Sequence, residues 1–333
     1  MKKILIIHTG GTFGMVPQKP SRTLAPGQVQ EQITRNVPEL EQIANIDFHA
    51  AFNMDSADME PVHWQTLARL IFEKLPEYDG FVIIHGTDSM IYTAAALSFM
   101  LKNLHKPVIL TGSQRPISEI RSDARMNLIN AVELATYDIP EVCICFGVEL
   151  FRGNRAIKES STDYGAFLSP NFLPLAEVGL EIYIDEHLLL KPSGAVELRP
   201  EMSRDVLAIP FFPGQRPEYL DWLLESPVKA IVIEALGLGN VAVRDPSLVN
   251  MIEKLTAADN LVVITSQSRH GWVDLSRYEN GKRIAAVGAI GAYDMTIEAT
   301  IVKLMHLLGT NQDGVSAVRE QLLTPIAGEI TVF

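Results

Sequence analysis

Short apolar runs alternate with longer segments of helical pattern through most of the chain. In the first half, the runs that predict strands are residues 4–8, 46–52, 80–85, 108–110 and 142–146. The segments between them that predict helices are residues 61–75, 90–104 and 122–137. This alternation of strand and helix predicts a parallel sheet that is covered by helices on both faces.

The pattern changes over residues 150–205, which are rich in turn-forming residues, and we expect a β-rich extension followed by a linker there. A second alternating unit follows, with predicted strands at 206–211, 230–234 and 261–265 and predicted helices at 217–225, 246–257 and 295–308. We therefore predict an α/β protein. Its larger N-terminal domain, residues 1–190, contains a flavodoxin-like parallel sheet and the β-rich extension. Residues 191–205 form the linker, and residues 206–333 form a smaller C-terminal α/β domain.

The composition is typical of a soluble two-domain protein. A length of 333 residues is long for one compact core, and 47% apolar residues allow a sizeable interior. A net charge of -12 argues against a nucleic-acid-binding surface and against binding to an anionic membrane. The apolar run at residues 4–7 is shorter than the roughly 7–15 apolar residues of a signal peptide, and no stretch is long enough to span a membrane. We expect a cytoplasmic protein with no nucleic-acid or membrane partner.

The sequence predicts no metal and no other cofactor. Cys143 and Cys145 lie on one predicted strand, where a bridge between them would be strained, so we expect two buried, reduced thiols. The 8 histidines do not cluster at metal-ligand spacing. Residues 237–242 fit a loose dinucleotide fingerprint, but the next predicted strand ends without the carboxylate that this motif requires. A nucleotide-dependent oxidoreductase is therefore disfavoured.

Two related motifs follow predicted strands, where open parallel sheets bind their ligands. They are Thr9-Gly10-Gly11-Thr12 and His85-Gly86-Thr87-Asp88, called here the threonine motifs. In a 2-1-3 strand order they would be neighbours. Glycines allow sharp turns and close approach to a ligand, and backbone N–H groups at the start of the next helix could hold a carboxylate or an oxyanion. The alternative is that the glycines only turn the chain and that Thr87 and Asp88 only cap the helix.

A hydroxyl nucleophile needs a neighbouring group that removes its proton. A desolvated lysine beside a carboxylate can do this, and Lys158 is the candidate. The residues alone do not bring it near Thr87, and they favour an ordinary surface lysine. Residues 53–59 also follow a predicted strand. There Ser56 could bind a substrate carboxylate, whereas Asp58 could be the cap of the helix that begins near Pro61.

Together and in this order, these motifs closely resemble those of the L-asparaginase family. The matching segments are residues 9–12, 54–59, 85–88, 110–114, 152–155 with Lys158, and 292–299. The resemblance covers essentially the whole chain, and the two threonine motifs at this spacing are highly specific. The start of the sequence and its length are most similar to those of the bacterial cytoplasmic type I branch. We expect no N-terminal extension of the kind found in relatives that act on glutamyl-tRNA.

The resemblance implies an L-asparagine amidohydrolase that forms L-aspartate and ammonia. Thr12 would attack the amide carbon and form a β-aspartyl enzyme. Thr87, Asp88 and Lys158 would form the proton-handling triad, and water activated there would hydrolyse the ester.

The resemblance also implies how the substrate is held. Backbone N–H groups at Gly11 and Gly86 would bind the oxyanion. The substrate-binding residues would be Asp55, Ser56, Thr87 and Asp88. Members of the family form homodimers or homotetramers in which a neighbouring subunit completes each site. Asn240 is the residue we expect there, with Asp294 and Glu298 as weaker candidates.

Three positions depart from the family pattern. Members usually carry a tyrosine in the mobile loop that follows the first threonine motif, but residues 15–27 contain none, and Thr23 is the nearest equivalent. Ala57 stands where periplasmic relatives often have a glutamine that contacts the substrate, which leaves the preference between asparagine and glutamine open. Residues 266–268 have serine where some allosterically activated members have cysteine, so the sequence does not decide whether the protein is regulated.

Two alternative functions remain at this point. One is a broader amidase that accepts glutamine or D-asparagine, and the other is a non-catalytic sensor that binds an amino acid with the same fold. The complete set of Thr12, Thr87, Asp88 and Lys158 argues against the sensor, because a pure binder needs no nucleophile and base.

Overall fold

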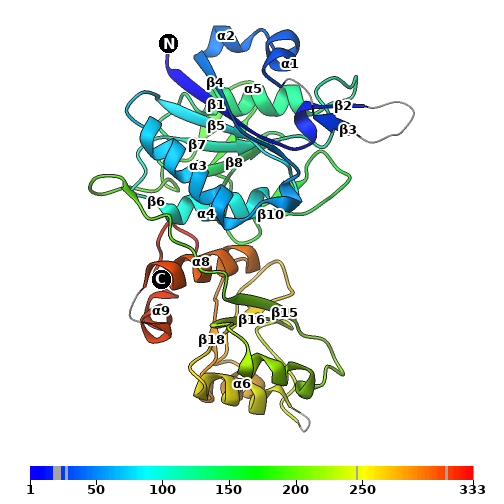
Figure 1. Ribbon diagram of the computed structural model, residues 1–333, viewed down its shortest axis with the longest axis vertical. Coiled ribbons are helices and arrows are strands. Elements are labelled where there is room, and N and C mark those ends of the chain that lie inside the picture. The colour runs from blue at the N-terminus through cyan, green and yellow to red at the C-terminus, as the bar shows by residue number, and fades with distance from the viewer. Residues whose placement is uncertain (18–23, 27–28, 245–246, 312–313, 333) are drawn as a thin grey trace. The chain divides into compact units, whose positions relative to one another are not determined.

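A parallel sheet at the centre of the first 200 residues determines where the threonine motifs lie (Figure 1). The computed structural model describes residues 1–17, 24–26, 29–244, 247–311 and 314–332. The chain folds as two units, Met1–Pro200 (the N-terminal unit) and Glu201–Phe333 (the C-terminal unit).

The sheet of the N-terminal unit contains eight strands in the order β13-β12-β9-β8-β7-β5-β1-β4. Its parallel strands are β1 (Lys3–Gly10), β4 (Asn45–Met54), β5 (Gly80–Ile84), β7 (Val108–Thr111) and β8 (Val142–Phe146). Taken in chain order, these strands are arranged 2-1-3-4-5, which confirms the predicted flavodoxin-like sheet and meets the condition under which the two threonine motifs are neighbours. His8 pairs with Ile84, so β1 and β5 leave the sheet side by side.

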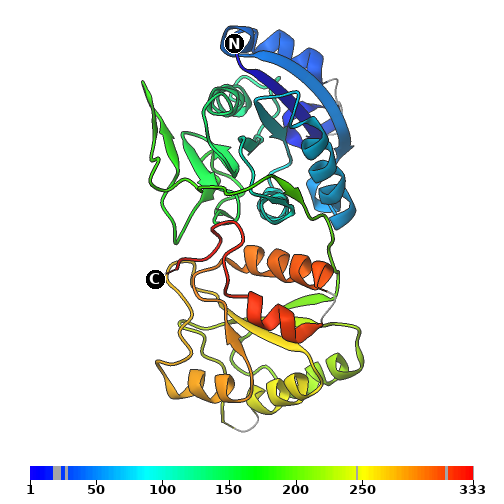
Figure 2. The same cartoon turned by 90° about the vertical axis from the view of Figure 1, so that its left-hand side faces the viewer.

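Apolar residues on both faces of the strands bury the sheet between two groups of helices. On one face, the helices α1 (Val29–Asn36), α2 (Leu40–Ile43) and α5 (Ala124–Leu134) share a core cluster with Ile4 and Ile6 of β1. On the other face lie α3 (Pro61–Lys74) and α4 (Met90–Met100), as Figures 1 and 2 show. Helix α4 is apolar through nearly its whole length and is buried, as its sequence predicts.

The ends of the predicted helices differ from the observed ones for local reasons. Helix α4 ends at Met100 rather than at residue 104, because Leu101–Lys102 forms a short strand, β6, that pairs with β14 (Glu197–Leu198). The expectation that Asp58 caps α3 is wrong. The N-cap is Glu60, whose backbone N–H donates to Nδ1 of His63 at 3.0 Å.

The predicted β-rich extension is confirmed as a set of short strands. They are β9 (Glu149–Arg152), β10 (Ile157–Lys158), β11 (Phe167–Leu168), β12 (Ala176–Val178) and β13 (Ile182–Ile184). A buried ion pair fixes the extension to the sheet edge: Arg152 donates from Nε to Glu141 at 2.6 Å and also to the carbonyl of Leu188 at 2.6 Å. This anchor precedes Lys158 by only a few residues, so it limits where that lysine can lie.

The boundary between the units follows Pro200, inside the segment 191–205 that the sequence predicts to be a linker. Part of this segment belongs to the N-terminal unit, because β14 pairs with β6. The domain limits 1–190 and 206–333 stay predictions.

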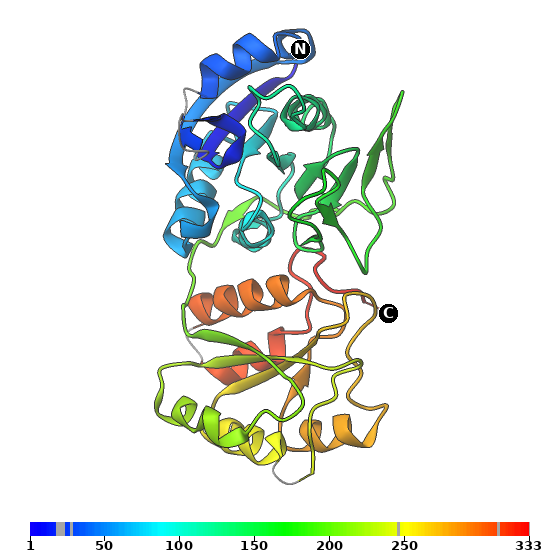
Figure 3. The same cartoon turned by 90° about the vertical axis from the view of Figure 1, so that its right-hand side faces the viewer.

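The C-terminal unit has its own parallel sheet of four strands, in the order β15-β16-β17-β18. They are β15 (Val206–Pro210), β16 (Ala230–Ala235), β17 (Leu261–Ser266) and β18 (Ile290–Gly291). One face packs on a 3₁₀ helix, η3 (Pro217–Glu225), and on α6 (Leu248–Ala257) and α7 (Glu279–Ala286). The other packs on α8 (Ile297–Thr310) and α9 (Val315–Gln321), as Figure 3 shows. In the described part of the chain, no helix has the length and apolar character needed to cross a membrane.

A fully buried ion pair holds the end of the chain onto α8. Lys303 and Glu329 are both 0% exposed, and Nζ of Lys303 lies 2.5 Å from Oε1 of Glu329. The same carboxylate accepts from the backbone N–H groups of Ile326 and Ala327, and the ammonium donates to the carbonyl of Thr324 at 2.7 Å.

Removing one partner of this pair is predicted to destabilise the C-terminal unit strongly. Lys303→Met leaves a buried carboxylate without its counter-charge, which costs about 3–5 kcal/mol of unfolding free energy. The double variant Lys303→Met/Glu329→Gln removes both charges, keeps an acceptor for the backbone N–H groups, and should recover a large part of that loss. The measurement is denaturant unfolding. The control is Lys254→Met, which breaks an exposed pair with Asp221 and should cost about 1 kcal/mol or less. Equal losses for Lys303→Met and the control would contradict this account.

Candidate active site

The two threonine motifs lie against each other because their glycines allow it. A Cβ on Gly11, which has φ +82°, would lie only 2.5 Å from the Cα of Gly86. A Cβ on Gly86 would lie 2.6 Å from Oγ of Ser56. The ends of β1 and β5 and the segment after β4 therefore converge in backbone contact, and a larger residue at either glycine would push them apart.

Thr12 stands at the start of a short 3₁₀ turn, η1 (Thr12–Gly14), directly after Gly11. The next side chain, Phe13, is 1% exposed and packs in the core, and its carbonyl accepts from the N–H of Ile117 at 3.0 Å. Thr12 itself is partly exposed. The buried Phe13 thus anchors the chain next to Thr12, and Thr12 remains partly exposed at the carboxyl end of β1.

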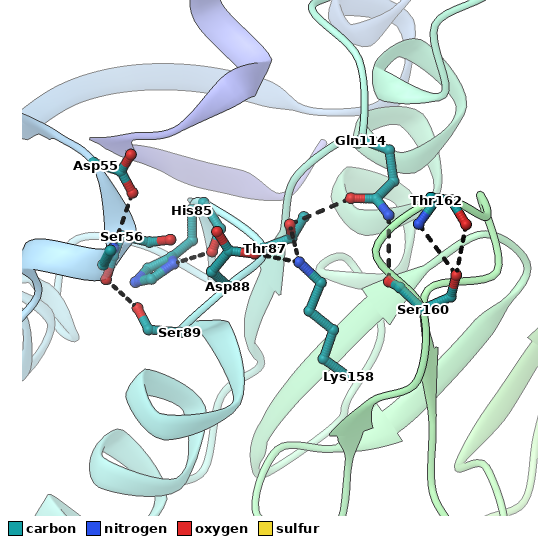
Figure 4. A network of polar contacts seen from close by, with 12 residues as sticks. Asp55, Ser56, His85, Thr87, Asp88, Ser89, Gln114, Lys158, Ser160 and Thr162 are labelled. Atoms are coloured by element: carbon teal, nitrogen blue, oxygen red, sulfur yellow. Dashed lines mark hydrogen bonds and ion pairs between the residues drawn. The ribbon is translucent and has the colours of Figure 1, made fainter.

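Lys158 reaches the second threonine motif from the β-rich extension (Figure 4). Its Nζ donates to Oγ1 of Thr87 at 2.8 Å and forms an ion pair with Oδ1 of Asp88. The lysine side chain is 15% exposed, whereas that of Asp88 is 70% exposed. Lys158 is therefore not the ordinary surface lysine that the sequence also allowed. In the described part of the chain, its hydrogen bonds go to Thr87 and Asp88 and not to Thr12.

Gln114 connects Thr87 to the loop that follows Lys158. The hydroxyl of Thr87 donates to Oε1 of Gln114 at 3.3 Å, and Nε2 of Gln114 donates to the carbonyl of Asp163 at 3.1 Å. Its backbone N–H donates to the carboxylate of Asp123 at 2.9 Å. Sequence reasoning assigned Gln114 no role. The available signal was its position after β7, a third strand whose end opens on the same edge of the sheet.

Asp55 and Ser56 lie beside Gly86 in different environments. Ser56 is 4% exposed, and its carbonyl accepts from Oγ of Ser89 at 2.5 Å. The carboxylate of exposed Asp55 accepts from the N–H of Ala57 at 2.9 Å and thereby caps the turn η2 (Ser56–Asp58). The structure thus gives Asp55 a local structural role, and its role in substrate binding stays a prediction.

The N–H of Gly11 is already engaged within the fold. It donates to the carbonyl of Met54 at 3.1 Å. This bond argues against the expectation that Gly11 supplies an oxyanion donor, because the same hydrogen cannot point at a ligand. The next N–H, that of Thr12, is the nearest replacement.

His85, which sequence reasoning also left without a role, is buried below the second threonine motif. It is 1% exposed, and loss of hydration lowers its pKa to about 4. Its Nδ1 lies 2.7 Å from the carbonyl of Gly86, and its Nε2 lies 2.9 Å from Oγ1 of Thr93.

Comparison with known proteins agrees with this geometry. Residues 3–189 match the family described as Asparaginase, N-terminal, and residues 205–321 match the Glutaminase/Asparaginase C-terminal domain. The chain belongs to the asparaginase family. It is therefore a hydrolase that acts on amides.

Full-length similarity supports the membership. The chain is 38% identical to L-asparaginase 1 of Escherichia coli (strain K12), over 99% of this chain and 98% of that one. The solved L-asparaginase of Thermococcus kodakarensis matches with a TM-score of 0.91 at 37% identity, over 99% of this chain and 100% of that one. L-asparaginase I of Vibrio cholerae matches with a TM-score of 0.89 at 37% identity, over 99% of each chain. A glutamyl-tRNA(Gln) amidotransferase component of Pyrococcus abyssi is also similar, at 35% identity over 100% of this chain and 78% of its own length.

The remaining predicted site residues of this asparaginase-family chain lie in the C-terminal unit. Asn240 closes a tight turn in which its N–H donates to the carbonyl of Leu236 at 2.8 Å. Asp294 accepts from the N–H of Thr331 at 3.0 Å and so holds the end of the chain. Burial raises the pKa of Glu298. The roles of these three residues in the site stay predictions.

The described residues contain no cluster of three or more histidine, cysteine, aspartate or glutamate side chains that could hold a metal. Cys143 and Cys145 are free and fully buried, and burial raises the pKa of Cys145 to about 12. Thr23, which the sequence places nearest to the usual loop tyrosine, lies outside the described residues.

The depressed pKa of His85 predicts a loss of stability in acid. The unfolded chain takes up a proton near pH 6.5, but the folded protein does so only near pH 4. Stability from this group is therefore complete above pH 6.5 and falls as the pH drops toward 4, by about 3 kcal/mol in total. His8, whose pKa burial also lowers to about 4, acts in the same direction.

The check is the unfolding free energy at pH 7 and pH 4.5 for wild type and His85→Asn. The variant should be less stable at pH 7 but should lose about 2 kcal/mol less than wild type on acidification. An identical loss in both proteins would rule out this assignment.

Proposed function

We propose that this chain hydrolyses the side-chain amide of L-asparagine to L-aspartate and ammonia through a threonine acyl-enzyme. The observation that carries the proposal is the contact of Lys158 with Thr87 and Asp88, directly beside the Gly11–Gly86 contact that positions Thr12. The names of the full-length relatives, L-asparaginase in three of the four compared, support asparagine as the substrate.

In the proposed reaction, Oγ1 of Thr12 attacks the amide carbon and the C–N bond breaks. The hydroxyl proton of Thr12 passes to the leaving nitrogen, and ammonia departs. Water then adds to the acyl carbon, the ester bond to Oγ1 of Thr12 breaks, one proton of the water passes to that oxygen, and aspartate is released. Negative charge forms on the carbonyl oxygen in both steps, so backbone N–H groups directed at that oxygen lower both barriers. The N–H groups of Thr12 and Thr87 are our candidates.

Thr87, Asp88 and Lys158 would move these protons. As an ammonium paired with Asp88, Lys158 donates to Thr87. As a neutral amine, it can accept the hydroxyl proton of Thr87 across the same 2.8 Å, once that hydroxyl has rotated from Gln114 toward the lysine. Ion pairing with Asp88 keeps the lysine in place in the charged state, while Gln114 orients the Thr87 hydroxyl.

The substrate would be bound at its α-carbon end by groups that flank Gly86. The hydroxyl of Ser56 suits the α-carboxylate, and the exposed carboxylate of Asp88 suits the α-ammonium. We further propose that the protein works as a homodimer or homotetramer, with Asn240 of a neighbouring subunit completing the site. The reaction as proposed uses no cofactor, and the cytoplasmic location stays a prediction.

A broader amidase is the second candidate, because the similarity to an amidotransferase component shows that this family includes proteins with other names. A non-catalytic sensor is disfavoured by the geometry. A protein that only binds an amino acid does not need a part-buried lysine, Lys158, between the hydroxyl of Thr87 and the carboxylate of Asp88. Nor does it need a second threonine, Thr12, next to the Gly11–Gly86 contact.

Ammonia release tests the substrate and the nucleophile together. Wild type should release ammonia from L-asparagine without added metal or nucleotide, and faster than from L-glutamine or D-asparagine. Thr12→Ala should lower turnover by about three orders of magnitude or more, because the nucleophile is lost. The matched control is Thr66→Ala, on the exposed side of α3, which should leave turnover unchanged. The proposal fails if wild type releases no ammonia from millimolar L-asparagine, and the Thr12 assignment fails if Thr12→Ala keeps substantial activity.

Lys158 has a separate test. Lys158→Met keeps the length of the side chain but removes the proton carrier, so kcat should fall by about a thousandfold or more. Lys74→Met, which breaks an exposed pair with Glu77, should have no effect. Circular dichroism establishes that both variants fold. If Lys158→Met retains more than roughly a tenth of the wild-type kcat, the lysine has no part in proton transfer.

A further inference from the structure

A buried chain of hydrogen bonds runs from α3 to the second threonine motif. Nε1 of Trp64 donates to Oγ1 of Thr93 at 3.0 Å. Oγ1 of Thr93 lies 2.9 Å from Nε2 of His85, and Nδ1 of His85 lies 2.7 Å from the carbonyl oxygen of Gly86. Trp64, Thr93 and His85 are 6%, 0% and 1% exposed. The chain therefore connects two helices with the loop after β5, out of contact with solvent.

Donor and acceptor rules, together with the neutral state of His85, fix the direction of every bond in this chain. An indole nitrogen can only donate and a carbonyl oxygen can only accept, so Trp64 donates to Thr93 and Nδ1 of His85 donates to Gly86. Burial lowers the pKa of His85 to about 4, so the ring is neutral at pH 7 and carries only this one proton. Nε2 is then an acceptor, and Thr93 donates its single hydrogen to it.

The last bond determines the orientation of one peptide group. Gly86 has no Cβ, so no side chain of its own restricts the orientation of the peptide that follows it. The bond from His85 holds the Gly86 carbonyl toward the buried side. In a planar trans peptide the following N–H points the opposite way, so the N–H of Thr87 is directed away from His85. Thr87 is partly exposed, whereas His85 and Gly86 are buried.

We infer that His85, held by Thr93 and Trp64, is a positioning residue that aims the N–H of Thr87 at the charge formed on the substrate carbonyl. This inference rests on the proposed amidohydrolase function. Among the described contacts, His85 hydrogen-bonds to Thr93 and to Gly86 and not to the hydroxyl of Thr12 or of Thr87. Its effect is exerted through the Gly86–Thr87 peptide, and so it should alter stabilisation of the transition state more than binding of the substrate.

Matched variants separate this role from a merely structural one. His85→Leu removes the donor to Gly86, whereas His85→Asn places an amide nitrogen near the position of Nδ1. Loss of an oxyanion donor typically lowers kcat by about 10²–10³. In His85→Leu the donor, the N–H of Thr87, is still present but poorly oriented, so kcat should fall by about tenfold or more. KM for asparagine should change by less than about threefold. His85→Asn should recover most of kcat. Thr93→Val should lower kcat in the same way and Thr93→Ser should not, which provides a second pair if a His85 variant fails to fold.

Histidine ¹⁵N NMR of the full chain tests the same chain of bonds without any substrate. His85 should be the neutral Nδ1–H tautomer in wild type and should lose that single preference in Thr93→Val. Detection of the Nε2–H tautomer in wild type would overturn the inference, and so would equal kcat values for wild type and folded His85→Leu. An inactive wild type would instead refute the proposed function and with it the catalytic role of His85, while the tautomer would still show whether the hydrogen-bonded chain exists.

Discussion

Backbone contact between Gly11 and Gly86 is the constraint on which the site depends. Parallel pairing of β1 with β5 brings the two strand ends together, and the absence of Cβ atoms lets the turns after them touch. Every other feature of the site is placed relative to this contact. Thr12 follows one glycine, Thr87 follows the other, and Ser56 packs against the second. A methyl group at either glycine would separate the two hydroxyls that the proposed reaction needs close together.

The groups on one side of this contact are buried and uncharged, and those on the other are more exposed and charged. One side of the contact is supported by neutral, buried groups that do not titrate at neutral pH, namely Trp64, Thr93 and His85. On the other side lie Lys158 and Asp88, which are more exposed and carry opposite charges. The proposed proton transfer therefore involves the more exposed groups, while the backbone that would bind the oxyanion is supported by buried hydrogen bonds.

Much of this architecture was predictable because it depends on local patterns. Buried parallel strands produce continuous apolar runs, so the strands and the position of both threonine motifs at strand ends followed from the sequence. The 2-1-3 order of the strands was only supposed. Lys158 was different. Its approach to Thr87 depends on β10 and on the Arg152–Glu141 anchor, which are long-range contacts with no periodic signal, and only the family resemblance singled it out. Gln114 and His85 were missed for the same reason: their roles arise from the partners that the fold supplies. The engagement of the Gly11 N–H by Met54 likewise depends on a neighbouring strand.

The central claim is that Thr12, and not Thr87, carries the acyl group, although Lys158 contacts Thr87. The most direct measurement is peptide mapping by mass spectrometry after a rapid acid quench of the enzyme with saturating asparagine. The account predicts that the peptide containing Thr12 gains the mass of one aspartyl group, and that Thr12→Ala shows no such adduct. An aspartyl group on the peptide that contains Thr87, in wild type and in Thr12→Ala alike, would contradict it.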